Sequence, residues 1–230
     1  MRKHFLFYIL LICQVLPALS QIEYGYERPK SSTDPWKFGV YGSATRDWVN
    51  QQAGIDKKTG YRVGLVAEKH LVYNLYFKPI LSFTYKGFKY ENAYKEGISS
   101  VSSDAYFRND VNAYLLNLEL TIEMKFGNAY KDRGFFLFFA PFFTQGIGGT
   151  SSYTRLNPNF PETYMVKQEY DTFGDNQVQK QDVGYVLGGG FDFNKYLQVN
   201  LFYTFGFINE GAYNNFRWRN FGASLVIFLE

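Results

Sequence analysis

The feature that most constrains this chain is a two-residue alternation of apolar and polar side chains, sustained over segments of eight to sixteen residues. Successive side chains of a β-strand point to opposite faces, so each such segment has one apolar face and one polar face. Five segments alternate clearly: 61–68, 71–86, 113–126, 182–193 and 196–207. Three more alternate less cleanly: 36–45, 135–145 and 216–229. Aromatic residues on both faces of 135–145 leave its register open.

Long apolar runs are missing although 20% of the residues are aromatic, and the mean hydropathy is −0.26. After residue 20, the longest uninterrupted apolar run is Phe135–Phe143, nine residues that include Pro141. A membrane-spanning helix needs about 20. In a transmembrane β-barrel, lipid-facing and lumen-facing residues alternate and their hydropathy averages out. We therefore predict an all-β fold, an eight-stranded antiparallel up-and-down transmembrane β-barrel.

The connections between the predicted strands alternate in length around the chain. Short links lie at 69–70, 127–133 and 194–195, and long ones at 46–58, 89–110, 146–181 and 208–215. Outer-membrane barrels have short periplasmic turns and longer extracellular loops. The alternation predicts that arrangement, with both ends of the barrel segment on the periplasmic side.

The first twenty residues have the organisation of a secretory signal. Basic Arg2 and Lys3 precede an apolar run, Phe5–Leu16, and small residues at Ala18 and Ser20 match a cleavage site. An N-terminal membrane anchor is the alternative, but the apolar run is too short to span a bilayer. We predict cleavage after Ser20, a periplasmic lead-in over 21–35, and an outer-membrane barrel over 36–230.

Little in the chain after residue 20 supports catalysis. The only cysteine is Cys13, and the only histidine beyond the predicted signal is His70, in a predicted turn. A serine–histidine pair, a thiolate nucleophile and a cysteine metal site are therefore not expected. Loss of Arg2 and Lys3 lowers the formal net charge from +3 to +1, which gives no reason to expect a nucleic acid partner. We expect no enzymatic activity, no cofactor and no metal.

Charged residues fall on the polar faces of the predicted strands and should point into the lumen. The interior of an eight-stranded barrel is only wide enough for side chains to fill it, and buried charges should pair. The predicted structural network comprises Arg62, Lys78, Glu119, Glu123, Asp182 and Asp192. Lys78 and Glu119 each lie seven residues from a predicted periplasmic strand end, so we expect them to pair. A narrow ion path, or a proton or ligand relay, remains open.

The longest predicted loop, 146–181, carries five aromatic residues among polar ones. They are Tyr153, Phe160, Tyr164, Tyr170 and Phe173. Exposed aromatic residues often form contact surfaces. These residues could serve as a contact loop outside the cell, or they could fold back onto the mouth of the barrel.

Several short motifs resemble those of PorT-like outer-membrane β-barrels. They are Gly64 with Ala67-Glu68, the run Ser82–Lys89, the strand Gly188–Asp192 and the following Tyr203–Gly206. The resemblance covers about 36–229. It implies a small barrel of the outer membrane, and it implies a part in protein secretion, as described for some members.

Three classes of function fit these observations. The first is a non-enzymatic barrel that acts as a scaffold or interaction partner in envelope biogenesis or protein secretion. Its partners would be outer-membrane lipid and an envelope or secretion protein. The second is a narrow pore for ions or small solutes. The third is a soluble lipocalin-like binder, which would require the apolar faces inside and the charged faces outside.

Overall fold

The computed structural model describes residues 35–50, 55–92, 106–128, 133–156, 165–174, 179–207 and 217–229. The strands are β1 (Lys37–Asn50), β2 (Ile55–Val72), β3 (Leu75–Asn92), β4 (Tyr106–Asn128), β5 (Arg133–Leu156), β6 (Met165–Asp171), β7 (Gln181–Asp192), β8 (Leu197–Gly206) and β9 (Arg217–Leu229). Within these ranges no helix is long and apolar enough to cross a bilayer. The predicted signal and all but the last residue of the predicted lead-in lie outside the described residues.

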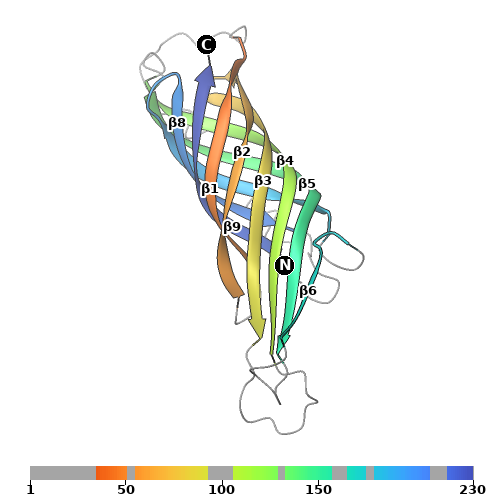
Figure 1. Cartoon of the computed structure of the whole chain (residues 1–230). Helices are drawn as coiled ribbons and strands as arrows, with labels where there is room; N and C mark the ends of the chain where they lie inside the picture. Colours follow the sequence, from red (N-terminus) through yellow and green to blue (C-terminus); the bar gives the residue numbers. More distant parts are fainter. Residues whose placement is uncertain are drawn as a thin grey trace, which may run out of the picture. The chain divides into compact units, whose positions relative to one another are not determined.

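Eight of these strands form a closed antiparallel barrel, which confirms the predicted fold (Figure 1). The first and last strands pair, with Phe38 opposite Leu229. β5 pairs with β4 along one edge and with β7 along the other. Lys37 at the start of β1 lies opposite Glu68, near the β2–β3 turn. We call this end of the barrel, which carries that turn and both barrel termini, the turn end, and the opposite end the loop end.

Polar side chains line the inside of the barrel, and apolar side chains cover the outside. On β8, inward Asn200 is 3% exposed, whereas its outward neighbour Leu201 is 55% exposed. The outward residues of β4 from Tyr114 to Phe126 cover roughly 30 Å of height once strand tilt is allowed for. This matches the apolar thickness of a bilayer. A soluble lipocalin-like binder would have the opposite arrangement of faces.

The β2–β3 hairpin turns at Tyr73 and Asn74, because Val72 lies opposite Leu75. The prediction of a turn at 69–70 is therefore wrong, and β2 continues through these residues. His70 points inward and is 5% exposed, and its Nε2 lies 2.7 Å from the carbonyl oxygen of Tyr73. The inward–outward alternation continues through Lys69 and His70. Two consecutive polar residues were therefore not enough to mark the end of the strand.

At the loop end the sheet continues beyond the segments predicted as strands. β1 extends to Asn50 and β2 begins at Ile55, so much of the predicted loop 46–58 is strand. The predicted loops 89–110 and 146–181 likewise contain the ends of β3, β4 and β5. The sequence did not reveal these strand ends because most of their residues are polar on both faces. The alternation of apolar and polar residues therefore stops, although the backbone pairing continues.

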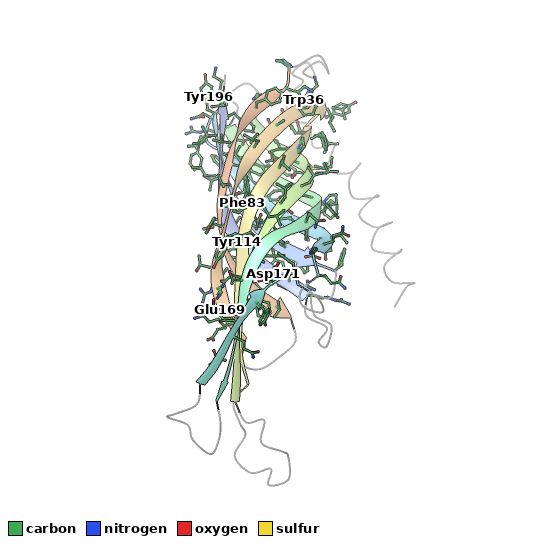
Figure 2. The ribbon with its side chains drawn as sticks, turned by 45° about the vertical axis from the view of Figure 1, so that its right-hand side comes forward. Trp36, Phe83, Tyr114, Glu169, Asp171 and Tyr196 are labelled. Carbon is green, nitrogen blue, oxygen red and sulfur yellow. The ribbon has the colours of Figure 1, made fainter. Side chains whose placement is uncertain are left out.

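A ninth strand, β6, also lies within the predicted loop 146–181. It pairs with β5 from Thr150 opposite Asp171 to Leu156 opposite Met165. β7 pairs with the same edge of β5 only as far as Gln145. Between the two, Ile147 is an extra residue in β5, a β-bulge that strengthens local twist. β3, β4, β5 and β6 thus form a sheet that extends from the barrel at the loop end, toward the bottom of Figure 1 and Figure 2.

The register of β5 is decided by its neighbour β7. Three phenylalanines of β5 face inward, each directly opposite a glycine: Phe136 and Gly190, Phe138 and Gly188, and Phe142 and Gly184. A Cβ atom at Gly188 would lie 2.5 Å from Cζ of Phe138 and 2.4 Å from the carbonyl oxygen of Leu201. The glycines of β7 therefore leave the space that the rings of β5 occupy.

Candidate functional site: the lumen and the loop-end rim

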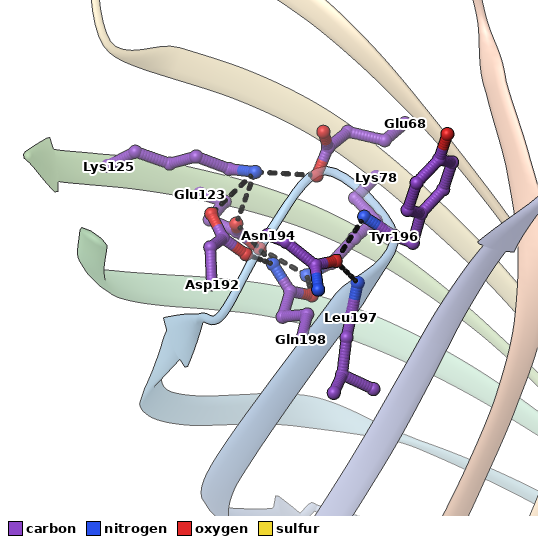
Figure 3. Close-up of polar contacts among 9 residues, drawn as sticks. All are labelled: Glu68, Lys78, Glu123, Lys125, Asp192, Asn194, Tyr196, Leu197 and Gln198. Carbon is purple, nitrogen blue, oxygen red and sulfur yellow. Dashed lines mark hydrogen bonds and ion pairs between the residues drawn. The ribbon is translucent and has the colours of Figure 1, made fainter. Parts of the chain in front are cut away.

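A cluster of charges fills the lumen at the turn end (Figure 3). Lys78 of β3 forms an ion pair with Glu123 of β4 and donates a hydrogen bond of 2.6 Å to Gln198 Oε1 on β8. Gln198 in turn donates to Glu123 at 2.9 Å and to Asp192 at 2.8 Å. Lys78 is 1% exposed and Glu123 is fully buried. A buried pair this far from water depends on such additional hydrogen bonds.

Lys125 of β4 extends this turn-end cluster to Glu68 of β2. Its Nζ lies 2.9 Å from Glu68 Oε2, 3.0 Å from Asp192 Oδ2 and 3.4 Å from Glu123 Oε1. The ammonium group also lies 4.5 Å from the ring centre of Tyr76. Lys125 therefore links carboxylates from β2, β4 and β7, and it closes the turn end of the lumen with charge.

The predicted pair of Lys78 and Glu119 is wrong. Lys78 lies opposite Thr121, so Glu119 and Glu123 are its two diagonal neighbours on β4. The predicted depth of Lys78 was measured from a turn at 69–70. Because the turn lies at Tyr73 and Asn74, Lys78 is four residues nearer the turn end than predicted. Of the two carboxylates, Glu123 pairs with Lys78, and Glu119 is bound by Arg62.

Glu119 pairs instead with Arg62 of β2, halfway along the lumen. Arg62 Nη1 lies 2.5 Å from Glu119 Oε1. Its Nη2 donates to Thr204 Oγ1 at 3.2 Å and to Asn220 Oδ1 at 3.3 Å, so the guanidinium group joins β4, β8 and β9. Asn117 Nδ2 donates to the same carboxylate at 2.7 Å. Arg62 therefore connects β2 to β4 on one side and to β9 and β8 on the other.

Near the loop end the lumen contains a third pair under an aromatic layer. Lys86 Nζ lies 3.9 Å from Asp182 Oδ2 and 4.2 Å from the ring centre of Trp218. Trp218 is 2% exposed and packs against Phe88 with ring centres 5.2 Å apart. Val49 and Val111 complete this apolar layer. A cation–π contact in a desolvated site supplements the long ion pair.

Little empty space remains between these layers. A small cavity lined by Tyr41, Lys78, Glu119 and neighbouring side chains has room for about one water molecule. Apolar clusters lie on either side of it, one around Tyr41, Ile80 and Val226 and one around Phe142 and Phe202. The described lumen is packed with side chains along its length.

The segment after β6 packs into the loop-end rim beside β4 and β5. Thr172 is fully buried, and its hydroxyl donates to the carbonyl oxygen of Asn112 at 2.7 Å. Phe173 is 7% exposed and packs with Ala113 and Leu115. A Cβ atom at Gly146 would lie 2.6 Å from Cζ of the Phe173 ring. Phe173 therefore folds back onto the mouth, one of the two alternatives for the loop aromatics.

Two of the other loop aromatics lie in described strands. Tyr170 belongs to β6 and is half-buried, and the backbone of Tyr153 in β5 lies opposite Gln168 of β6. Phe160 and Tyr164 lie outside the described residues. A contact role for this segment stays a prediction.

Side chains that could bind a metal ion are not grouped in the described part of the chain. No group of three histidine, cysteine, aspartate or glutamate side chains there could hold a metal ion.

Gln198 is the residue whose role the sequence did not indicate. Its position on the inward face was predictable from alternation, but its contacts with Lys78 and Glu123 join it to strands distant in sequence.

Comparison with known sequences identifies the family. A family model described as "Outer membrane protein beta-barrel domain" matches residues 26–211, most of the chain. The chain belongs to this family. Its location is accordingly the outer membrane, with the turn end periplasmic and the loop end extracellular. A comparison with curated proteins found no match.

Solved structures of outer-membrane barrels resemble this member of the family distantly. Neisserial surface protein A is 11% identical, with 88% of this chain and all of that chain covered and a TM-score of 0.38. Ail, the attachment invasion locus protein of Yersinia pestis, is 8% identical, with 84% and 97% covered and a TM-score of 0.42. The N-terminal barrel of Pseudomonas aeruginosa OprF is 10% identical, with 82% and 97% covered and a TM-score of 0.28.

Proposed function

We propose that this protein is a non-enzymatic scaffold or interaction partner in envelope biogenesis or protein secretion, anchored by its barrel and acting through its loop-end sheet. The observation that carries the proposal is the continuation of β4, β5 and β6 beyond the barrel. β6 forms seven residue pairs with β5 beyond the point where pairing of β5 with β7 stops. A hydrogen-bonded sheet is a more rigid contact surface than a loop, so less entropy is lost on binding.

The packed lumen favours this function over the narrow pore. Three layers of ion pairs and the buried ring of Trp218 occupy the path that a solute would follow. Conduction requires water or ion sites that connect the two ends, and the small cavity near Lys78 has room for only about one water molecule.

Kinship with PorT-like barrels is part of the same proposal, because that resemblance is the reason to name secretion. Export through cleavage after Ser20 and a periplasmic lead-in over 21–35 also belong to it. Mass spectrometry of the purified outer-membrane protein tests this cleavage, with Gln21 as the expected first residue.

Photo-crosslinking in intact cells tests the proposed contact surface. A crosslinking amino acid at Glu169, which is exposed on β6, should capture a defined envelope or secreted protein. The same amino acid at Lys195, exposed in the periplasmic β7–β8 turn, is the matched control and should not capture it. Equal products at both positions would contradict the proposal.

Planar bilayer recordings test the pore directly. The purified protein should give no steady conductance. Steady conductance that rises when Trp218 is replaced by alanine would favour the pore and contradict the scaffold.

A further inference from the structure

We propose that the outer wall of the barrel at the extracellular end binds the phosphate groups of outer-leaflet lipid. The site comprises Arg46 of β1, Lys57 of β2 and Arg219 of β9, which we call the cationic strip. It uses a different face from the contact surface on β6, and it does not depend on the proposed function.

Aromatic contacts place the cationic strip on the outer wall. Trp48 of β1 packs edge-on against outward Tyr203 of β8, with ring centres 5.7 Å apart. Lys57 Nζ lies 4.7 Å from the ring centre of Trp48, and Arg219 Cζ lies 5.4 Å from that of Phe205. The residue between Arg46 and Trp48, Asp47, points inward and is fully buried.

Strand pairing brings the three cations close together. Arg46 lies opposite Thr59 of β2, two residues from Lys57. On its other side, β9 places Arg219 opposite Trp48. Figure 1 shows β2, β1 and β9 side by side along one side of the barrel. The strip therefore spans three adjacent strands at one depth.

The charges of the cationic strip are not neutralised within the described residues. Arg46 donates to Thr59 Oγ1 at 3.3 Å, and Arg219 donates to the carbonyl oxygens of Gly206 at 2.6 Å and Trp218 at 2.8 Å. No described carboxylate forms an ion pair with any of the three cations. By contrast, Lys58 and Lys89 at the same end share Asp110.

The depth of the cationic strip matches the lipid headgroups. Phe221, opposite Arg46, and Tyr61, two residues beyond Thr59, are each 50% exposed, and they are the last large outward residues of β9 and β2 before the strip. Aromatic residues at such positions lie at the headgroup level. Arginine forks bind phosphate through two parallel hydrogen bonds, and the Trp48 ring holds Lys57 beside them.

Lipid binding by the purified protein in detergent tests the site. The probes are phosphorylated lipid A, the same lipid A with its phosphates removed, and inorganic phosphate alone, measured by native mass spectrometry. Each cation near an anionic lipid surface contributes about fivefold, so phosphorylated lipid A should be preferred by roughly a hundredfold. The triple variant R46Q/K57Q/R219Q should lose that preference. The double variant R46Q/K57Q, which leaves the hydrogen bonds of Arg219 intact, should lose most of it.

The matched control, K37Q/K69Q/K195Q, removes three cations at the periplasmic end and should keep the preference. Equal binding of both forms of lipid A would overturn the proposal, and so would equal losses in the control and the triple variant. Inorganic phosphate that binds as tightly as the lipid would overturn lipid as the ligand. If the triple variant does not fold, preference retained in the double variant would overturn the site.

Discussion

Lys78 and Glu123 form an ion pair in the lumen, with Gln198 hydrogen-bonded to both. Their strands are neighbours, but Gln198 comes from β8, on another part of the barrel wall. This contact joins distant strands at the depth where the turn end closes, so its loss should weaken the whole barrel.

Removal of one member of this pair should strand the other charge. Lys78→Met and Glu123→Gln should each lower the free energy of unfolding by roughly 3–5 kcal/mol, and the double variant should lose much less than their sum. Denaturant unfolding in lipid vesicles measures the cycle. A parallel cycle of Lys78→Met with Glu119→Gln should show weaker coupling, because Glu119 pairs with Arg62. Stronger coupling to Glu119 would contradict the observed pairing of Lys78 with Glu123.

A charge on the lipid face should be costly in proportion to its depth. Leu201 lies mid-strand on β8 and points outward, so Leu201→Arg should destabilise the protein by about 2–4 kcal/mol. Phe207, outward just beyond the end of β8, is the control. Phe207→Arg should cost about 0–1 kcal/mol, because arginine at the interface reaches water. Equal costs in vesicle unfolding experiments would mean that the membrane lies at another height.

The turn between β2 and β3 stores backbone strain at Tyr73, whose φ of 52° is left-handed. Tyr73 is 76% exposed, so its ring contributes little packing. Tyr73→Gly should therefore stabilise the protein by about 1 kcal/mol. Asn74→Gly at the next position, where φ is not positive, should not stabilise it. Thermal unfolding in detergent compares the two variants. Destabilisation by Tyr73→Gly would show that the backbone at Tyr73 is not strained.

The fit of β5 rings over β7 glycines predicts an asymmetry between glycine substitutions. Gly188→Ala should cost about 1–3 kcal/mol, because its Cβ would overlap both the Phe138 ring and the backbone of β8. Gly42→Ala is the control, since a Cβ there meets nothing within 4 Å. Equal midpoints of thermal unfolding for the two variants would show that β5 and β7 do not interlock.

Alternation in the sequence determined which face of most strands meets lipid. The period of two is a local property of the extended backbone, so Leu201 outward and Asn200 inward could be predicted without knowledge of any partner strand. It also predicted the inward positions of Arg62, Lys78 and Glu123. The same signal failed for 135–145, where both faces are aromatic.

Only the tertiary structure decided which inward residues meet. Lys78 lies opposite Thr121, between Glu119 and Glu123, and it pairs with Glu123 while Arg62 binds Glu119. Phe138 faces inward because Gly188, fifty residues later, leaves room for its ring. β6 exists as a strand because the edge of β5 beyond Gln145 is not paired with β7 and offers backbone hydrogen bonds to it. These contacts depend on register between segments far apart in the chain. The period of two fixes the face on which a residue lies, but not which residue of the neighbouring strand lies opposite it.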